Sequence, residues 1–284
     1  MAETQETTET YFADFARLER ETTPSAASWI HPLRKAAMER FGDTGFPTTH
    51  DEDWRFTNVA PIARGGFKMP KASGVLTAGQ LANVVFDGVA ARLVFVDGLF
   101  DAGLSSLKPS PNGAAGGVTL TPLATALDAP PKILQEHLAG HAETGHNPFV
   151  ALNTAFLRDG AVIQIANDLA LKEPLHVIHV RTGEAEGTVT HPRTLVVAGR
   201  GAQAMVIESY VSLAEEAYFT NAVTEVVVGE NASVEHVKLQ DESGLAFHVG
   251  TVQTRQERSS RFHSYSISLG GRLARHDVNA VLAG

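Results

Sequence analysis

The residues of this chain with the widest chemical potential are its 12 histidines, because cysteine is absent from the sequence. A chain without thiols holds no disulfide, no thiolate nucleophile and no cysteine-ligated zinc or iron–sulfur cluster, so a metal ion would need His, Asp or Glu ligands. His176 and His179 lie three positions apart in a predicted strand, where they point to opposite faces. His137, His141 and His146 fall near helix ends and loops, where an imidazole commonly bonds a last-turn carbonyl. We interpret all five as structural.

His236 and His263 are the pair most suited to a shared site. A repeat with a step of 27 places them on neighbouring coils of a predicted solenoid, with the two imidazoles about 5 Å apart. Two stacked imidazoles bind a metal ion or form a ladder on the surface. Because no third ligand occurs at the matching register, we favour the ladder and predict no metal-binding residue.

Paired carboxylates would indicate a glycosidase, and Glu208 with Glu235 or Asp277 with Glu225 are the available pairs. Carboxylates on the faces of a solenoid are more commonly solvated charges, and we interpret them so. The glycine-containing segment 199–204 precedes a predicted strand, whereas a phosphate-binding loop needs a helix N-terminus. No Gly-x-Ser-x-Gly nucleophile turn occurs either. The sequence therefore predicts no catalytic and no cofactor-binding residue, and we expect a protein that is not an enzyme.

Composition narrows the class of protein further. The 284 residues carry 23 Lys and Arg against 32 Asp and Glu, and the resulting formal charge of −9 disfavours nucleic acid as the main partner. The first ten residues contain three Glu, and neither a secretory signal nor an apolar run of membrane-spanning length follows. We expect a cytoplasmic protein that does not enter a membrane.

The elements that would position these side chains divide into a helical and a β region. Residues 1–90 are predicted to be mostly helical, because apolar residues recur at helical spacing from Tyr11 to Phe41. Residues 91–284 are predicted to form the β core, which begins with a hairpin at Asp97-Gly98 and is interrupted near 121–157 by helices that begin at Pro131 and Pro148. Further strands are predicted at 161–166, 175–180, 195–198, 202–211, 223–228, 234–239, 251–254 and 261–269.

The predicted strands recur with a loose period. Gly199 and Gly229 occupy matching segments at a step of 30, and residues 232–236 match residues 259–263 at a step of 27. Strands and tight turns that repeat at this interval predict a β-solenoid, in which each coil buries a face on the next. An antiparallel sandwich with coincidental spacing is the alternative. The solenoid requires residues 232–236 to lie parallel to residues 259–263 and beside them.

Several ordered segments resemble the SufB/SufD family of the SufBCD iron–sulfur cluster assembly complex, and its SufD subunits in particular. They are PTTHDEDWRFTNVAPI at 47–62, RLVFVDGLF at 92–100, FVALNTAFLRDGAVIQIA at 149–166 with EPLHVIHV at 173–180, and SLGGRLARHDVNAVLAG at 268–284. These segments occur in the family's order and span nearly the whole chain. The segment 51–57 is the one that favours SufD over its paralogue SufB.

The resemblance implies both a fold and a role. The fold is a helical N-terminal region followed by a right-handed parallel β-helix, and the role is that of a scaffold subunit that pairs with SufB and works with the SufC ATPase. An iron–sulfur cluster and ATP would be handled by the complex, so this chain itself would bind no cofactor. The residues that match the family's pattern are interpreted as fold determinants or interface contacts; they are Trp54, Arg55, Asn153, Gly271, Arg272 and Asp277.

The chain also departs from the family's pattern. Members continue far beyond the segment that matches 268–284, through further coils that carry the family's functional histidine and then through the helices that dock SufC. We expect this chain to be truncated within its β-helix, with 272–282 as a final strand whose open edge favours self-association. The alternatives to a SufD-like scaffold are a β-helix enzyme that acts on carbohydrate and a histidine-based metal-binding protein.

Overall fold

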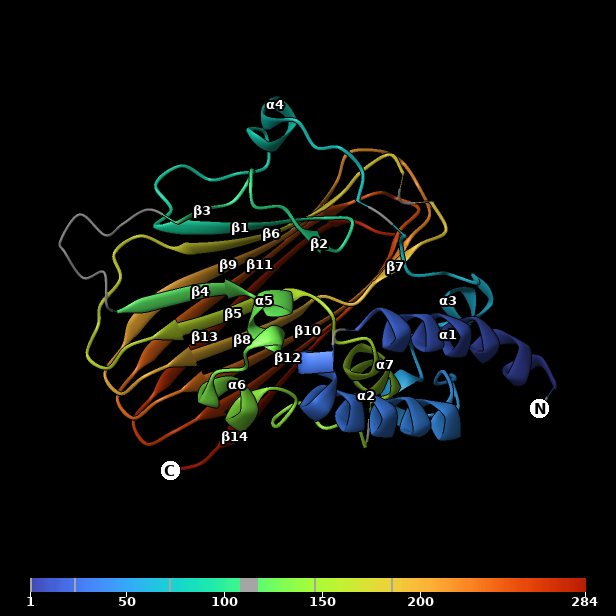
Figure 1. Cartoon of the computed structure of the whole chain (residues 1–284), viewed down its shortest axis with the longest axis horizontal. Coiled ribbons are helices and arrows are strands. Elements are labelled where there is room, and N and C mark those ends of the chain that lie inside the picture. The colour runs from blue at the N-terminus through green and yellow to red at the C-terminus, as the bar shows by residue number, and fades with distance from the viewer. Residues whose placement is uncertain (1, 23, 72, 108–116, 146, 185) are drawn as a thin grey trace.

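The chain forms a flattened parallel β-solenoid with a helical region packed against one side (Figure 1). This computed structural model describes residues 2–22, 24–71, 73–107, 117–145, 147–184 and 186–284. In these residues two sheets of seven strands face each other. The predicted mainly β fold with a parallel solenoid is confirmed, and the antiparallel sandwich is wrong.

Each coil contributes one strand to each sheet. The first sheet contains, in spatial order, β13 (Arg261–Gly270), β11 (Ser233–Glu242), β9 (Gln203–Ser212), β6 (Leu175–Arg181), β1 (Ala91–Val96) and β2 (Leu99–Phe100), with β3 (Ser106–Leu107) also paired to β1. The second contains β14 (Leu273–Leu282), β12 (Phe247–Gln256), β10 (Phe219–Val228), β8 (Arg193–Ala198), β5 (Gly160–Ile165) and β4 (Val118–Pro122), with β7 (Val189–Thr190) also paired to β10. The β1–β2, β1–β3 and β4–β5 pairs are antiparallel, and the pairs between successive coils are parallel. The predicted hairpin at Asp97-Gly98 is the β1–β2 pair.

The coils become shorter along the chain. Gln203 pairs with Ser233 at a step of 30, and Ser233 pairs with Arg261 at a step of 28. In the second sheet Phe247 pairs with Leu273 at a step of 26. The predicted step of 30 is confirmed for the earlier coils, and the predicted step of 27 between residues 232–236 and 259–263 is too short by a single position.

This small error has a large consequence for the two histidines on these coils. Asn231 and Ser259 hold the same position in their turns, with φ of 60° and 57°. These two residues are 28 positions apart, which is also the step between paired residues of β11 and β13. A shift by a single position turns a side chain to the other face of a strand. His236 therefore lies buried between the sheets, whereas His263 lies exposed on the outer face, and the predicted histidine ladder does not form.

The space between the sheets is filled by every second side chain of each strand. Its apolar part is built mainly from valine, alanine and isoleucine, including Ile163, Val206, Val226 and Val234. Branched side chains suit this position because they pack well on a pleated surface. All residues of β10 are buried, because other parts of the chain cover the outer face of this strand as well.

Helices form the N-terminal part of the chain and the segment that precedes β5. They are α1 (Ala2–Glu21), α2 (Pro24–Thr44), the 3-10 helix η1 (Glu52–Trp54), α3 (Ala60–Arg64), α4 (Ala78–Leu81), α5 (Leu123–Asp128), α6 (Lys132–His137) and α7 (Pro148–Ala155). The predicted helix starts at Pro131 and Pro148 are confirmed at α6 and α7.

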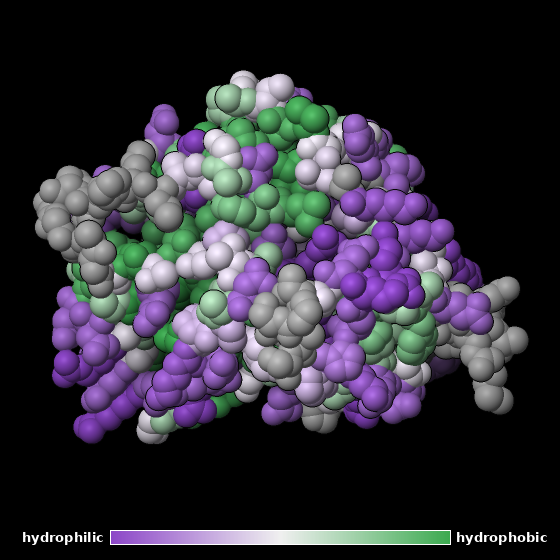
Figure 2. All heavy atoms as spheres, in the orientation of Figure 1, coloured by the Kyte–Doolittle hydropathy of each residue, from purple (hydrophilic) through white to green (hydrophobic). Residues whose placement is uncertain are grey.

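The helical region and the second sheet share one apolar core. α2 packs on α7, and the Phe149 ring of α7 lies 5.0 Å from the Trp54 ring and 5.9 Å from the Phe219 ring, measured between centroids. This core contains residues of both helices and strands. The division of the chain into a helical region at 1–90 and a β core at 91–284 stays a prediction. Figure 2 shows a mainly hydrophilic surface over the N-terminal helices and hydrophobic side chains gathered around α4, where Val75 and Phe86 are exposed.

Candidate functional site

One part of the space between the sheets is polar, and we call this part the polar interior. It is lined by inward-facing side chains of β9, β11 and β12, all of them buried. Its members are Glu208, Tyr210, His236, Lys238, Gln240, Glu242 and His248. Burying so many polar groups is costly unless they bond one another, so their contacts decide what this region can do.

Glu208 is the centre of the first group of contacts. Its Oε2 accepts hydrogen bonds from Nε2 of His236 at 2.7 Å and from the Thr224 hydroxyl at 2.6 Å, and its Oε1 accepts one from the Thr194 hydroxyl at 2.5 Å. Burial acts to raise the pKa of Glu208, but these three donors outweigh it and hold the pKa at about 2. Glu208 is therefore an anion at neutral pH, and its hydrogen bonds join both sheets.

Glu242 and His248 form the second group. Nδ1 of His248 donates to Oε2 of Glu242 at 2.7 Å, and the Thr220 hydroxyl donates to Oε1 at 3.0 Å. Burial lowers the pKa of His248, so its imidazole is neutral, while its contact with Glu242 keeps the pKa of that carboxyl low. Between the two groups lies Lys238, whose Nζ donates to Oε1 of Gln240 at 2.9 Å and whose pKa burial lowers to about 8.

Sequence reasoning did not identify the polar interior as a unit. The signal is present in β11, where His236, Lys238, Gln240 and Glu242 alternate with outward-facing residues and so share a face with the buried Val234. Polar residues at alternate positions normally indicate a solvent face. Only the register with β9 and β13 shows that this face points inward.

Among the sequence-predicted motif residues, the structure brings Trp54 and Asp277 together through Arg275. The guanidinium carbon of Arg275 lies 3.9 Å from the centroid of the Trp54 ring, and its Nε donates to Oδ2 of Asp277 at 2.9 Å. Its Nη1 donates to the Asp53 carbonyl at 2.8 Å and to the Thr57 hydroxyl at 3.1 Å. The connector near the N-terminus is thus joined directly to β14, close to the other end of the chain. Sequence analysis did not single out Arg275.

Asn153 lies in a separate buried network under α7. Its Nδ2 donates to the carbonyls of Pro192 and Asn221 at 2.9 and 2.8 Å, and its Oδ1 accepts from Nη1 of Arg193 at 3.0 Å. Arg193 and Glu225 form an ion pair with no exposed surface, at 2.7 Å. Glu225 also accepts three backbone N–H groups from residues 139–142, so the network fixes the segment after α6 to the sheet.

The remaining motif residues lie at the surface. Gly271 has a φ of 82°, a conformation that suits glycine in the turn between β13 and β14. Arg272 follows it with its guanidinium carbon 5.7 Å from the Phe247 ring centroid. Arg55 is exposed beside Phe56, whose side chain is 95% exposed. Whether any of the six motif residues forms an interface stays a prediction.

The structure also places the other histidines that the sequence analysis named. His176 faces outward and bonds the Ser209 hydroxyl at 2.8 Å, whereas His179 faces inward, so the two lie on opposite faces as predicted. The rings of His137 and His141 stack with a centroid distance of 5.3 Å. His146 lies outside the described residues.

The proposed carboxylate pairs do not form a glycosidase site. Glu208 is buried with His236, while Glu235 faces outward on β11. Glu225 is held by Arg193, and Asp277 bonds Arg275. The interpretation of these carboxylates as solvated charges is wrong for Glu208 and Glu225, which are buried and bonded to His236 and Arg193, because the two sheets enclose Glu208 and the segment after α6 covers Glu225.

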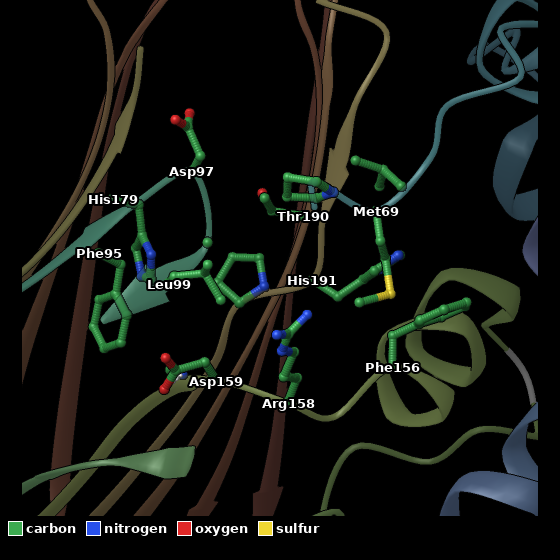
Figure 3. Close-up of a pocket in the computed structure, with 15 residues that line it drawn as sticks. Met69, Phe95, Asp97, Leu99, Phe156, Arg158, Asp159, His179, Thr190 and His191 are labelled. Atoms are coloured by element: carbon green, nitrogen blue, oxygen red, sulfur yellow. Dashed lines mark hydrogen bonds between the residues drawn. The ribbon is translucent and has the colours of Figure 1, made fainter. Parts of the chain in front are cut away.

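A small cavity of about 30 Å³ lies between the β1–β2 turn, the start of β5 and the strand β7 (Figure 3). Its two carboxylates are occupied by structural hydrogen bonds. Asp97 accepts from the backbone of Gly74 and Thr182 at 2.9 and 3.0 Å, and Asp159 accepts from the backbone of Phe100 at 2.9 Å. The cavity is large enough for water and too small for a substrate.

Within the described residues no group of three or more His, Asp or Glu side chains has the geometry to hold a metal ion. No helix in the described part of the chain is long and apolar enough to cross a membrane.

Comparison with known proteins gives several relatives of similar description. The chain is 30% identical over 256 residues to an iron–sulfur cluster assembly SufBD family protein of Synechocystis, covering 86% of this chain and 55% of the relative. It is 27% identical over 263 residues to the chloroplastic protein ABCI7 of Arabidopsis thaliana, covering 90% and 54%. It is 26% identical over 260 residues to the iron–sulfur cluster assembly protein SufD of Escherichia coli, covering 89% and 56%. The chain thus spans about half the length of these relatives.

Two protein-family models match the chain in succession. The model described as the SufBD protein N-terminal region matches residues 5–177, and the model described as the SufBD core domain of SUF system FeS cluster assembly matches residues 180–284. The first match alone exceeds half of the chain, and the second covers the coils that contain the polar interior. The resemblance predicted from the sequence is confirmed: the chain belongs to the SufBD family of iron–sulfur cluster assembly proteins.

Proposed function

We propose that this chain is a scaffold subunit of a SufBCD-type iron–sulfur cluster assembly machinery, which pairs with a SufB-like paralogue and works with a SufC-like ATPase. The observation that carries this proposal is the succession of two SufBD family matches across residues 5–284. The relative from E. coli is named an iron–sulfur cluster assembly protein, and neither family description names a catalysed reaction. The cluster and ATP belong to the complex in this proposal, and the cytoplasm is its location.

The structure supports a scaffold role over catalysis by the way it uses its reactive groups. The carboxylates Glu208, Glu225 and Asp277 each bond a basic side chain of the same chain. A catalytic acid or base must instead reach a substrate proton. These carboxylates hold coils and helices together, as a rigid platform for partners requires.

Co-purification tests the proposal. The tagged chain is produced together with the SufB-like and SufC-like proteins of the same organism, and we expect the SufB-like protein to be recovered with it. The control is the same chain without a tag, produced with the same two proteins, from which the resin should recover neither.

Recovery of neither protein with the tagged chain would argue against the scaffold role. Size-exclusion chromatography of the isolated chain tests the predicted self-association separately, because a monomer at every concentration would contradict it.

A further inference from the structure

Two imidazoles face one small space beside Gly250 in the polar interior. Gly250 on β12 pairs with His276 on β14, and His248 precedes it by two positions on the same face. Nε2 of His248 and Nδ1 of His276 each lie 3.2 Å from the position that a Cβ atom would occupy on Gly250. The absence of a side chain at this one position lets the two nitrogens face the same volume.

The nitrogen of His248 that faces this space carries a lone pair. Nδ1 of His248 donates its proton to the Glu242 carboxylate at 2.7 Å, so the neutral imidazole has no proton on Nε2. Within the described part of the chain, neither Nε2 of His248 nor either ring nitrogen of His276 has a hydrogen-bond partner. An imidazole that donates one N–H to a carboxylate and leaves its other nitrogen unpartnered has the arrangement of a metal-ligating histidine.

The surrounding charges favour a cation. The ionisable neighbours of these two imidazoles are Glu208 and Glu242, both with lowered pKa values and therefore anionic, together with Lys238 and His236. Two carboxylates outweigh one ammonium as long as the imidazoles are neutral. His276 is partly exposed as a residue, but both of its ring nitrogens are buried, so they face the interior and not solvent.

We propose that Nε2 of His248 and Nδ1 of His276 form a two-ligand site for a divalent first-row transition-metal ion, with water in the remaining coordination positions. Imidazole nitrogens suit zinc, copper, iron and nickel ions more than magnesium or calcium. The site has two protein ligands, which agrees with the lack of any three-ligand group in the residues that the structure describes. This inference goes beyond the scaffold role and does not depend on it.

Binding of Co²⁺ tests the site, because its visible absorption reports coordination by nitrogen. Equilibrium dialysis and absorption titration are carried out on the full chain and three variants. His276→Ala removes one ligand, and Gly250→Ala places a methyl group 3.2 Å from both nitrogens while keeping both ligands. The control His263→Ala removes an exposed imidazole on the outer face of β13.

We expect the wild-type chain and His263→Ala to bind one Co²⁺ with the same affinity, and His276→Ala and Gly250→Ala to bind it at least about tenfold more weakly. Saturating Co²⁺ should raise the Tm of the first two proteins and leave that of the other two nearly unchanged. Circular dichroism without metal shows whether each variant is folded. If Gly250→Ala does not fold, the comparison of His276→Ala with the wild-type chain tests the site. Wild-type affinity in either variant, or no Co²⁺ binding by the wild-type chain, would overturn the proposal.

Discussion

Mild acid should destabilise this protein strongly, because several buried histidines, among them His176, His179 and His191, are neutral in the folded state. Burial lowers the pKa of His176 and His179 to about 4 and that of His191 to about 3. His179 is stacked between the rings of Phe95 and Tyr210, each with a centroid distance of 5.0 Å, and His191 is stacked on the Phe156 ring at 4.7 Å. Burial against these rings deprives an imidazolium of most of its hydration, which disfavours the charged form.

The sign and size of the effect follow from proton binding. In the unfolded chain these histidines titrate near pH 6.5, so below that pH the unfolded state binds more protons than the folded state. The stabilisation by the neutral rings is complete above pH 6.5 and is lost as the pH falls toward the folded pKa values. Each histidine costs about 1.4 kcal/mol at pH 5.5, so the three together lower the free energy of unfolding by about 4 kcal/mol relative to pH 7.5. Such a loss is a large fraction of the stability of an ordinary domain.

Urea unfolding followed by circular dichroism at pH 7.5, 6.5 and 5.5 measures this loss. The variant His191→Phe keeps an aromatic ring against Phe156 and removes one titrating group, so its loss between pH 7.5 and 5.5 should be smaller by about 1.4 kcal/mol. The control His263→Gln changes an imidazole that is exposed in the folded chain as well, and it should keep the wild-type pH dependence. A wild-type loss below about 1 kcal/mol, or an unchanged loss in His191→Phe, would refute the reasoning.

Three further substitutions test the contacts that join the coils and helices. Arg193→Met leaves the carboxylate of Glu225 buried without its ion pair and should lower the free energy of unfolding by about 3–5 kcal/mol, whereas the double variant with Glu225→Gln should recover part of this loss in the same urea assay. Arg275→Ala removes the cation that covers Trp54 and should lower the free energy of unfolding by about 1–2 kcal/mol, with a red shift of tryptophan fluorescence. An unshifted spectrum would mean that Arg275 does not shield this ring. Gly271→Ala places a residue with a side chain at a φ of 82° and should lower the free energy of unfolding by about 1–2 kcal/mol. A thermal scan that shows the wild-type Tm would mean that the turn adopts another conformation without cost.

The strands were predictable from the sequence because their alternation and their turns are local signals. Every strand predicted between residues 161 and 269 is present, with bounds that differ at the ends. The register was less predictable, since the repeat becomes shorter from the β9–β11 pair to the β11–β13 pair. Matching Ala232 with Ser259 by residue type gave a step of 27, whereas the equivalent turn residue is Asn231. Because Asn231, and not Ala232, corresponds to Ser259, the step is 28, and His236 faces inward while His263 faces outward.

The candidate site was harder to predict because its members come from separate coils. Nothing local indicates that the polar face of β11 points inward, and the nearness of His248 and His276 depends on the pairing of β12 with β14 and on the glycine at position 250. Local patterns report the face of a strand, but they do not report what lies on the neighbouring strand.

Three of the six motif residues that carried the resemblance to the family contact segments that are distant in the sequence. Trp54 and Asp277 meet at Arg275, and Asn153 meets Arg193 beneath α7. Such a contact constrains residue type at both of its ends, because a stacked ring, a carboxylate or an amide of the right shape must be present for the partner to be satisfied. This constraint on residue type explains how short motifs indicate the family although the chain is only 26% to 30% identical to these relatives. The contacts of Arg275 also join the N-terminal connector to β14, so a movement of β14 would reach Trp54 through direct contacts.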